Sequence, residues 1–142
     1  MRFELNNKWR CLHSISGLFY VIPVFLLYNK NNCIGYCLYT VCAILSFLWS
    51  YTSRGGVNGT ISKLDEYVAY ICVIYNYYFF LQLSTPEKYN KIPGFIFCHL
   101  AGIIYFLKEY LIKHNYNVVI SYGILHFIWR TISSIGVILL YL

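Results

Sequence analysis

The sequence predicts an all-α, multi-pass membrane helical bundle of five, or six, transmembrane helices, in which residues 1–142 form a single transmembrane domain. Composition is the first observation behind this prediction. Hydrophobic residues make up 59% of the chain, charged residues only 11%, and the mean hydropathy is +0.56. Soluble domains carry about 25% charged residues. The 11 basic and 5 acidic residues are too few to cover a soluble globule of this length, so lipid is the expected surrounding.

The second observation is a series of five apolar runs separated by polar breaks. A bilayer core about 30 Å thick needs roughly 20 mostly apolar residues per helix. Polar Asn29–Asn32 ends the first run, and Pro86 with its polar neighbours is expected to form a turn after the third, because proline cannot continue a helix. Pro93 is expected in the first turn of the fourth helix. The predicted spans cover residues 12–28, 33–53, 64–83, 93–112 and a stretch within 117–142.

The N-terminal run has a second interpretation, a cleaved signal peptide, because basic residues precede it. No small-x-small cleavage site follows Tyr28, so we favour an uncleaved first helix. With five spans, six basic residues fall on the side of the N-terminus and three on the other, which predicts a cytoplasmic N-terminus. The sequon Asn58-Gly59-Thr60 points the other way, since it is usable only in a lumen. We expect an endomembrane such as the ER or Golgi.

Two other features limit the function classes. The basic residues are scattered singly, which argues against a nucleic-acid partner despite the net charge of +6. The six cysteines contain no CxxC pair, and burial in the packed interior is their expected role. A disulfide framework is the alternative, but such scaffolds are short and rich in loops. Membrane lipids, or other membrane proteins, are therefore the expected partners.

Ionisable residues inside apolar spans are costly and mark candidate sites. Several have a plain structural explanation. Lys108 and Glu109 are expected to form an interfacial charge pair, because long side chains near a helix end reach the headgroups. His13 is expected at a helix start with the same role. His99 is expected to be buried and bonded to a backbone carbonyl rather than to a ligand.

Three residues form a stronger candidate set. Asp65 opens the third run, where the helix dipole favours an acid. Arg130 follows His126 by four residues, so the two share a helix face. Arg130 lies roughly 18 Å from the far end of its helix at 1.5 Å per residue, too far to reach water, and needs a carboxylate or a wet cavity. Asp65 is the best partner, because both helices start on one side. We expect a buried polar cluster of Arg54, Asp65, His126 and Arg130.

The motifs around these residues resemble those of the CREST superfamily of membrane hydrolases, which includes alkaline ceramidases, progestin and adiponectin receptors and GPI-anchor lipid-remodelling enzymes. The remodelling branch has Trp-Ser followed four residues after the Ser by a His, then Lys-Leu-Asp with its Asp eleven residues further on, and a last helix with His-x-x-Trp-His. This chain keeps that spacing in about 25 residues and in the order of its helices. The matching segments are Trp49-Ser50, Arg54, Lys63-Leu64-Asp65 and His126-Phe127-Ile128-Trp129-Arg130.

The resemblance implies a catalytic set of Ser50, Asp65 and His126, but the metal ligands depart from it. In that family three His residues bind zinc, and here Arg54 and Arg130 stand at two of those positions. Arginine is always protonated and has no acceptor, so His126 would be the only family ligand kept. Catalytic zinc sites use about three protein ligands. We therefore expect no cofactor. The family also has seven helices, and this chain shows five apolar runs.

Three hypotheses for function follow. The first is a CREST-like membrane protein without zinc catalysis, in a lipid-binding or membrane-interaction role. The second is an active, ceramidase-like or lipid-remodelling hydrolase of amide or ester bonds, in which zinc would be the cofactor. The third is a small subunit of a membrane complex that binds haem or quinone through His99 and His126.

Overall fold

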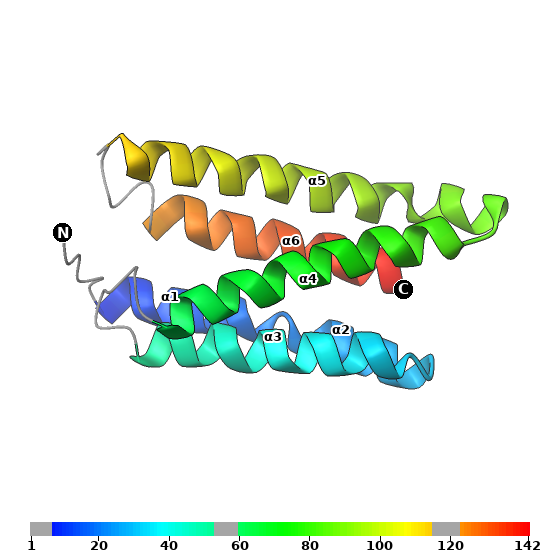
Figure 1. Ribbon diagram of the computed structural model, residues 1–142, viewed down its shortest axis with the longest axis horizontal. Helices are drawn as coiled ribbons and strands as arrows, with labels where there is room; N and C mark the ends of the chain where they lie inside the picture. The colour runs from blue at the N-terminus through cyan, green and yellow to red at the C-terminus, as the bar shows by residue number, and fades with distance from the viewer. Residues whose placement is uncertain (1–6, 53–59, 115–122) are drawn as a thin grey trace. The chain divides into compact units, whose positions relative to one another are not determined.

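The computed structural model describes residues 7–52, 60–114 and 123–142, and every regular element in these ranges is helical (Figure 1). The predicted all-α fold is therefore confirmed. The chain divides into two compact units, Met1–Gln82 and Leu83–Leu142. The first contains α1 to α4 and the second contains α5 and α6. The helices are α1 (Asn7–Leu18), α2 (Val21–Asn29), α3 (Cys33–Thr52), α4 (Thr60–Gln82), α5 (Thr85–Lys113) and α6 (Leu125–Tyr141).

The first apolar run is two helices rather than one. A turn at Phe19–Tyr20 separates α1 from α2, and two three-residue backbone hydrogen bonds tighten it, from Phe19 N–H to Ser16 O and from Tyr20 N–H to Gly17 O. Pro23 lies in the first turn of α2. Proline has no N–H to continue an unbroken helix, but it is tolerated in a first turn, which explains the break just before it.

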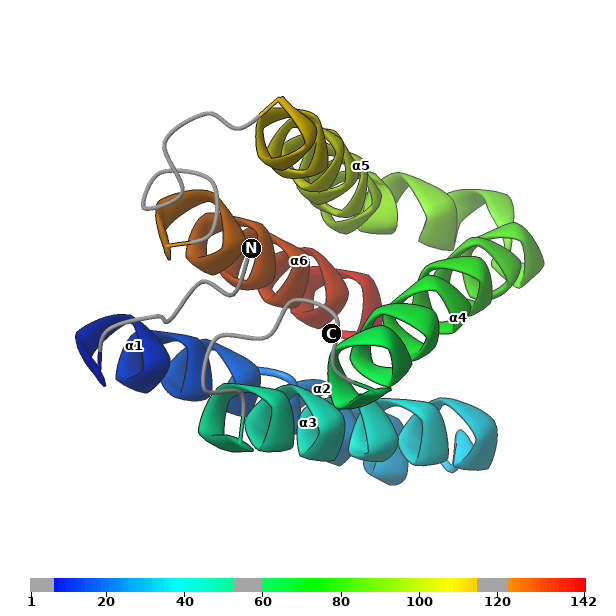
Figure 2. The same cartoon turned by 60° about the vertical axis from the view of Figure 1, so that its left-hand side comes forward.

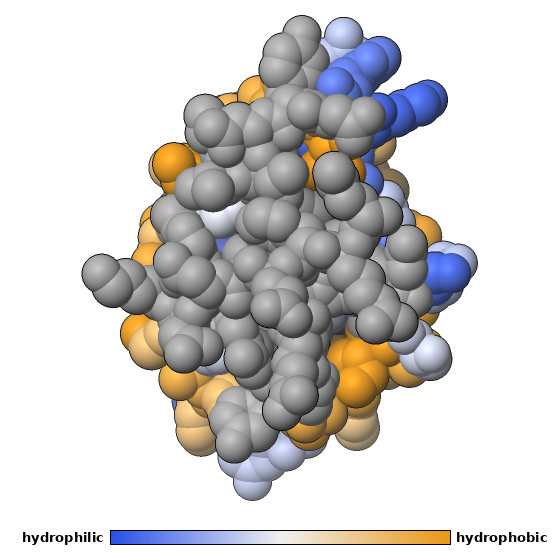
Figure 3. Space-filling model, turned by 90° about the vertical axis from the view of Figure 1, so that its left-hand side faces the viewer, coloured by the Kyte–Doolittle hydropathy of each residue, from blue (hydrophilic) through white to orange (hydrophobic). Residues whose placement is uncertain are grey.

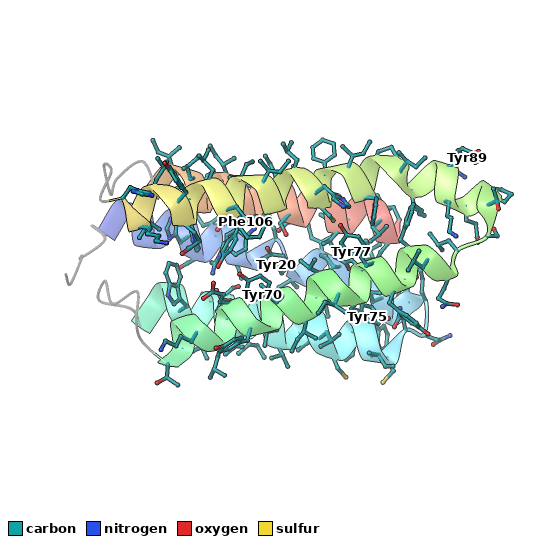
Figure 4. All side chains as sticks on the ribbon, turned by 45° about the horizontal axis from the view of Figure 1, so that its top comes forward. Tyr20, Tyr70, Tyr75, Tyr77, Tyr89 and Phe106 are labelled. Atoms are coloured by element: carbon teal, nitrogen blue, oxygen red, sulfur yellow. The ribbon has the colours of Figure 1, made fainter. Side chains whose placement is uncertain are left out.

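Helix α3 is central to the first unit, since α1, α2 and α4 each pack against it. Two buried hydrogen bonds join α3 to α4: Tyr39 O–H donates to Asn76 Oδ1 at 2.8 Å, and Ser46 O–H donates to Asp65 Oδ1 at 2.6 Å. Helix α4 carries many aromatic side chains, including Tyr70, Tyr75 and Tyr77 (Figure 4). Polar pairs therefore help to fix how these two apolar helices pack.

The second unit is an antiparallel pair of helices, in which α5 runs beside α6. A Cβ at Gly94 would lie 2.5 Å from the backbone nitrogen of Leu140, and one at Gly136 would lie 2.8 Å from that of Cys98. Side chains larger than hydrogen do not fit at these two positions, so the two glycines let the helix backbones approach closely.

The start of α5 corrects one sequence expectation. The segment around Pro86 is not a turn, because Ser84 and Glu87 form a capping box and Pro86 occupies the first helical turn. The Ser84 N–H donates to Glu87 Oε2 at 3.0 Å. Pro93 therefore lies inside the helix rather than in its first turn. Figure 2 shows α5 changing direction along its length, as a helix with an interior proline commonly does.

Within the part of the chain that the structure describes, two segments are long and apolar enough to cross a membrane, Cys11–Asn29 and Thr85–Lys113. Cys33–Trp49 and Leu125–Tyr141 are shorter apolar helices. Helix α4 has the length of a span, but Lys63, Asp65 and Glu66 cluster near its beginning and lower its hydropathy. The described residues thus support membrane association, with the strongest signals at the first and fourth predicted spans.

Candidate functional site

Asp65 is the buried acid of the first unit. It is 6% exposed and accepts the 2.6 Å hydrogen bond from Ser46 O–H. Helix α4 begins at Thr60, so Asp65 lies in the second turn and not at the helix start. The interpretation of Asp65 as a first-turn residue favoured by the helix dipole is therefore wrong, because that effect fades within the first turn. A hydroxyl from the neighbouring helix takes the place of the expected helix-end stabilisation.

His13 lies in the same unit, on α1. It is fully buried, and its ring stacks on Trp49 of α3 with centroids 5.7 Å apart. One turn further along α1, a Cβ at Gly17 would lie 3.4 Å from the Ser46 Cβ, so α1 passes closely over Ser46. The expectation of an interfacial His13 at a helix start is wrong, because α1 begins at Asn7 and places His13 in its middle. The first unit thus buries an acid, a hydroxyl and an imidazole on three neighbouring helices.

The second unit contains a basic and aromatic cluster, which we define as Tyr105, Lys108, His126, Trp129 and Arg130. Lys108 Nζ lies 4.4 Å from the Tyr105 ring centroid and 5.2 Å from that of Trp129. Such distances give cation–π attraction, which strengthens away from water. Lys108 also pairs with Glu109 at 2.8 Å, which confirms the predicted charge pair. Lys108 is nevertheless only 4% exposed, so it does not extend toward solvent as expected.

The α6 members of this cluster lie on one face of the helix. His126 is buried, and its ring meets that of Trp129 edge-on with centroids 5.1 Å apart. Arg130 is fully buried, and its carbonyl accepts a 2.8 Å hydrogen bond from the Ser134 hydroxyl. Both residues are held inside the helical unit, as the sequence led us to expect for an arginine far from the C-terminal end of its helix.

The register of the α5–α6 pair separates the two histidines of the haem hypothesis. Gly136 contacts Cys98, and Trp129 contacts Tyr105 with ring centroids 5.1 Å apart. The same antiparallel register places His126 beside residue 108, nine residues from His99 and roughly 13 Å along the axis at 1.5 Å per residue. His99 is exposed, and its Nδ1 lies 2.8 Å from the Phe95 carbonyl oxygen. The predicted hydrogen bond of His99 to a backbone carbonyl is confirmed, whereas its predicted burial is wrong. The imidazoles of His99 and His126 are too far apart along the helix pair to bind the same haem iron.

The predicted polar cluster is distributed over the chain as follows. Asp65 belongs to the first unit, whereas His126 and Arg130 belong to the second. Arg54, Asn58 and the side chain of Ser50 lie outside the described residues. The structure confirms burial of Asp65, His126 and Arg130, and the pairing of Asp65 with Arg130 stays a prediction.

The donor chemistry does not fit a zinc site. His126 lies on the same helix face as Arg130, and the register of α5 against α6 places it beside Lys108. Neither of these two cations has a lone pair to offer a metal in its charged form. Within residues 7–52, 60–114 and 123–142, no group of three His, Cys, Asp or Glu side chains could hold a metal ion.

Ser46 was not predicted to belong to a site, and Lys108 was expected only as half of an interfacial charge pair. Ser46 precedes Ser50 by one helical turn, so it shares the face of α3 that was expected to carry the site. Lys108 follows Tyr105 by three residues, a spacing that lets a lysine stem fold over a ring on the same helix. Both signals are local, but neither distinguishes a buried residue from one facing lipid.

No known protein family matches the chain, and neither any curated protein nor any solved structure is significantly similar to it.

Proposed function

We propose that this chain is a multi-pass integral membrane protein with five or six membrane helices and a polar interior, which acts by binding membrane lipids or neighbouring membrane proteins. The observation that carries the proposal is the inverted distribution of its side chains. Large apolar residues are exposed along every helix, for example Phe25 at 64%, Ile74 at 69% and Ile103 at 65%. Water would not tolerate such a surface on a monomer, whereas lipid requires it.

The polar residues complete the same pattern. Among the described residues, His13, Asp65, Lys108, His126 and Arg130 are all buried. Charged side chains in membrane helices face the protein interior, because exposure to acyl chains costs several kcal/mol. Around the rim of the face in Figure 3, hydrophobic residues reach the surface in several places, while the most hydrophilic ones lie toward one side. Exposed apolar and buried charged residues together support a lipid-facing protein more strongly than hydropathy alone.

The resemblance to CREST hydrolases enters as part of this proposal. Asp65, His126 and Arg130 all lie on helices and are buried, which fits a bundle of that kind in which arginine replaces metal ligands. An arginine near a carboxylate neutralises it as a metal ion would, but it cannot generate a nucleophilic water. We therefore propose a non-hydrolytic role, with the active lipid hydrolase as the alternative that the experiment tests.

The experiment compares the purified chain in phospholipid nanodiscs with its His126→Ala variant. We expect no release of fatty acid from ceramide or from ester-linked phospholipid, with or without added zinc, by either protein. We expect native mass spectra from mild detergent to retain phospholipid adducts on the chain. Zinc-dependent release that His126→Ala abolishes would replace this proposal with the hydrolase. Recovery of the chain as a lipid-free soluble monomer would end the membrane proposal altogether.

A further inference from the structure

Two thiols lie side by side on the outer surface at the beginning of α3. Cys33 is the first residue of the helix and Cys37 lies one turn further along. Both are exposed, and their i, i+4 spacing places the two side chains next to each other on one face of the helix. The sequence had suggested that the cysteines are packing residues, and these two are not.

The backbone beneath the thiols is firmly held. Asn32 Oδ1 accepts the Gly35 N–H at 3.0 Å, which caps the first turn of α3, and it also accepts the Tyr75 hydroxyl from α4. Asn31 closes the preceding turn with a φ of 54°, a left-handed conformation that asparagine tolerates better than most residues.

The packed side of α3 is the one opposite the thiols. A Cβ at Gly35 would lie 3.0 Å from both the Leu27 and the Tyr75 side chains, so this side is pressed against α2 and α4. Residues 33 and 37 lie about 40° apart around a helix of 3.6 residues per turn, and residue 35 projects from the far side. The thiol pair therefore faces outward on a rigid support.

We propose that Cys33 and Cys37 form a binding site for a soft monovalent metal ion, Cu(I). Soft thiolate ligands select Cu(I), zinc and iron–sulfur clusters over hard cations. Side chains at positions i and i+4 have Cβ atoms about 5–6 Å apart. A metal ion can bridge that distance with two metal–sulfur bonds of about 2.3 Å, the length found in zinc thiolates. Cu(I) is stable with two sulfur ligands, whereas structural zinc requires four donors.

The surroundings favour this ion over a divalent one. Among the described residues, no third His, Cys, Asp or Glu joins the pair to form a group that could hold a metal. Binding releases one proton from each thiol and forms two Cu–S bonds without any change of oxidation state. The product, a bis-thiolate with one negative charge, lies at a helix N-terminus, where the dipole favours anions. Lys30, three residues before Cys33, is exposed and adds positive charge to this end of the chain.

The location also allows exchange of the ion. Cys33 follows the polar segment Asn29–Asn32, and Cys37 lies only about 6 Å deeper along the helix axis. Both thiols are thus within the headgroup region when α3 crosses a bilayer, where a water-soluble donor can reach them. The pair shares no residue with Asp65, His126 or Arg130, so the copper site and the proposed non-hydrolytic function stand or fall separately.

The test titrates Cu(I) into the full-length protein in detergent, without oxygen and with a thiol-free reductant, against the Cu(I) chelator bathocuproine disulfonate. We expect the protein to withdraw one equivalent of Cu(I) from the chelator and to release two protons per ion in weak buffer. Cys33→Ser and Cys37→Ser should each lose this binding. Cys11→Ser should keep it, because Cys11 is also exposed but lies on α1 outside the pair.

Three results would overturn the site: no withdrawal of Cu(I) by the wild-type protein, equal binding by the Cys33→Ser/Cys37→Ser double variant, or equal loss in Cys11→Ser. Thermal unfolding of each variant in the same detergent separates loss of binding from loss of fold. Serine is nearly isosteric with cysteine, and both positions are exposed, so we expect unchanged unfolding temperatures.

Discussion

The hydroxyl of Ser46 donates to the carboxylate of Asp65 at 2.6 Å, across the interface between α3 and α4 and out of contact with solvent. A short hydrogen bond to a charged acceptor is about twice as strong as a neutral one. It therefore does more than pack two helices, since it supports Asp65, an acid buried in the first unit. The candidate site depends on this support, whatever else Asp65 contacts.

Ser46→Ala should lower the free energy of unfolding by about 1.5–3 kcal/mol, the range for hydrogen bonds to charged groups. The measurement is reversible unfolding in mixed micelles of a mild detergent and SDS. Thr131→Ala is the matched control, because its hydroxyl donates only to the Phe127 carbonyl of its own helix. A Ser46→Ala change no larger than that of the control would show that Asp65 does not rely on this hydroxyl.

The close contact of α5 with α6 gives a second prediction. Gly94→Ala and Gly136→Ala should each destabilise the protein by about 1–3 kcal/mol, because the added methyl meets backbone atoms that cannot move aside. Gly102→Ala should be neutral or stabilising by up to about 1 kcal/mol, since a Cβ there meets nothing within 4 Å and alanine favours helix. If all three variants behave alike in the same unfolding assay, the two helices do not pack as described.

The chain should not bind zinc stoichiometrically. Arginine stands at two of the three positions that correspond to family ligands, and His126 lies among cations. Elemental analysis of protein purified without chelator should find well under one equivalent of zinc. One equivalent in the wild type that disappears in His126→Ala, with Cys37→Ser retaining it, would contradict this prediction and revive the hydrolase.

Asp65 and Arg130 are predicted from the sequence to form a buried ion pair. Removing one partner of a buried pair costs about 3–5 kcal/mol, because the other charge is left uncompensated. Asp65→Ala and Arg130→Ala should each cause a loss of this size. Asp65→Leu with Arg130→Met should recover much of it. A double variant as unstable as the sum of the single ones would show that the two residues are not partners.

The sequence predicted some levels of this structure better than others. Helix class and the positions of the polar breaks follow from apolar runs, and a buried Arg130 follows from its distance to the far end of its helix. Helix boundaries near prolines did not follow, because the same residue ends a helix, begins one or bends one according to its neighbours. Pro23 begins α2, Pro86 lies in the first turn of α5 and Pro93 lies inside it.

The partners of the buried polar residues could not be predicted either. Ser46 belongs to the site because it contacts Asp65 on another helix. Lys108 belongs to its cluster because it contacts Trp129, which also lies on another helix. A single sequence shows which residues share a helix face. It does not show whether that face turns toward a neighbouring helix or toward lipid. His13 was expected at an interface and is buried in the middle of α1, whereas His99 was expected to be buried and is exposed.

The membrane crossing itself is tested most directly on α5. In a background with the six native cysteines replaced by serine, single cysteines are introduced at Lys88, Ile103 and Lys113, near the beginning, in the middle and at the end of the helix. Each is labelled with a membrane-impermeant maleimide in sealed vesicles, before and after permeabilisation. We predict that Lys88→Cys and Lys113→Cys are labelled from opposite faces, and that Ile103→Cys, although 65% exposed, is labelled from neither. Labelling of all three from one face, or of Ile103→Cys as readily as of Lys88→Cys, would contradict a membrane-spanning α5 and the account built on it.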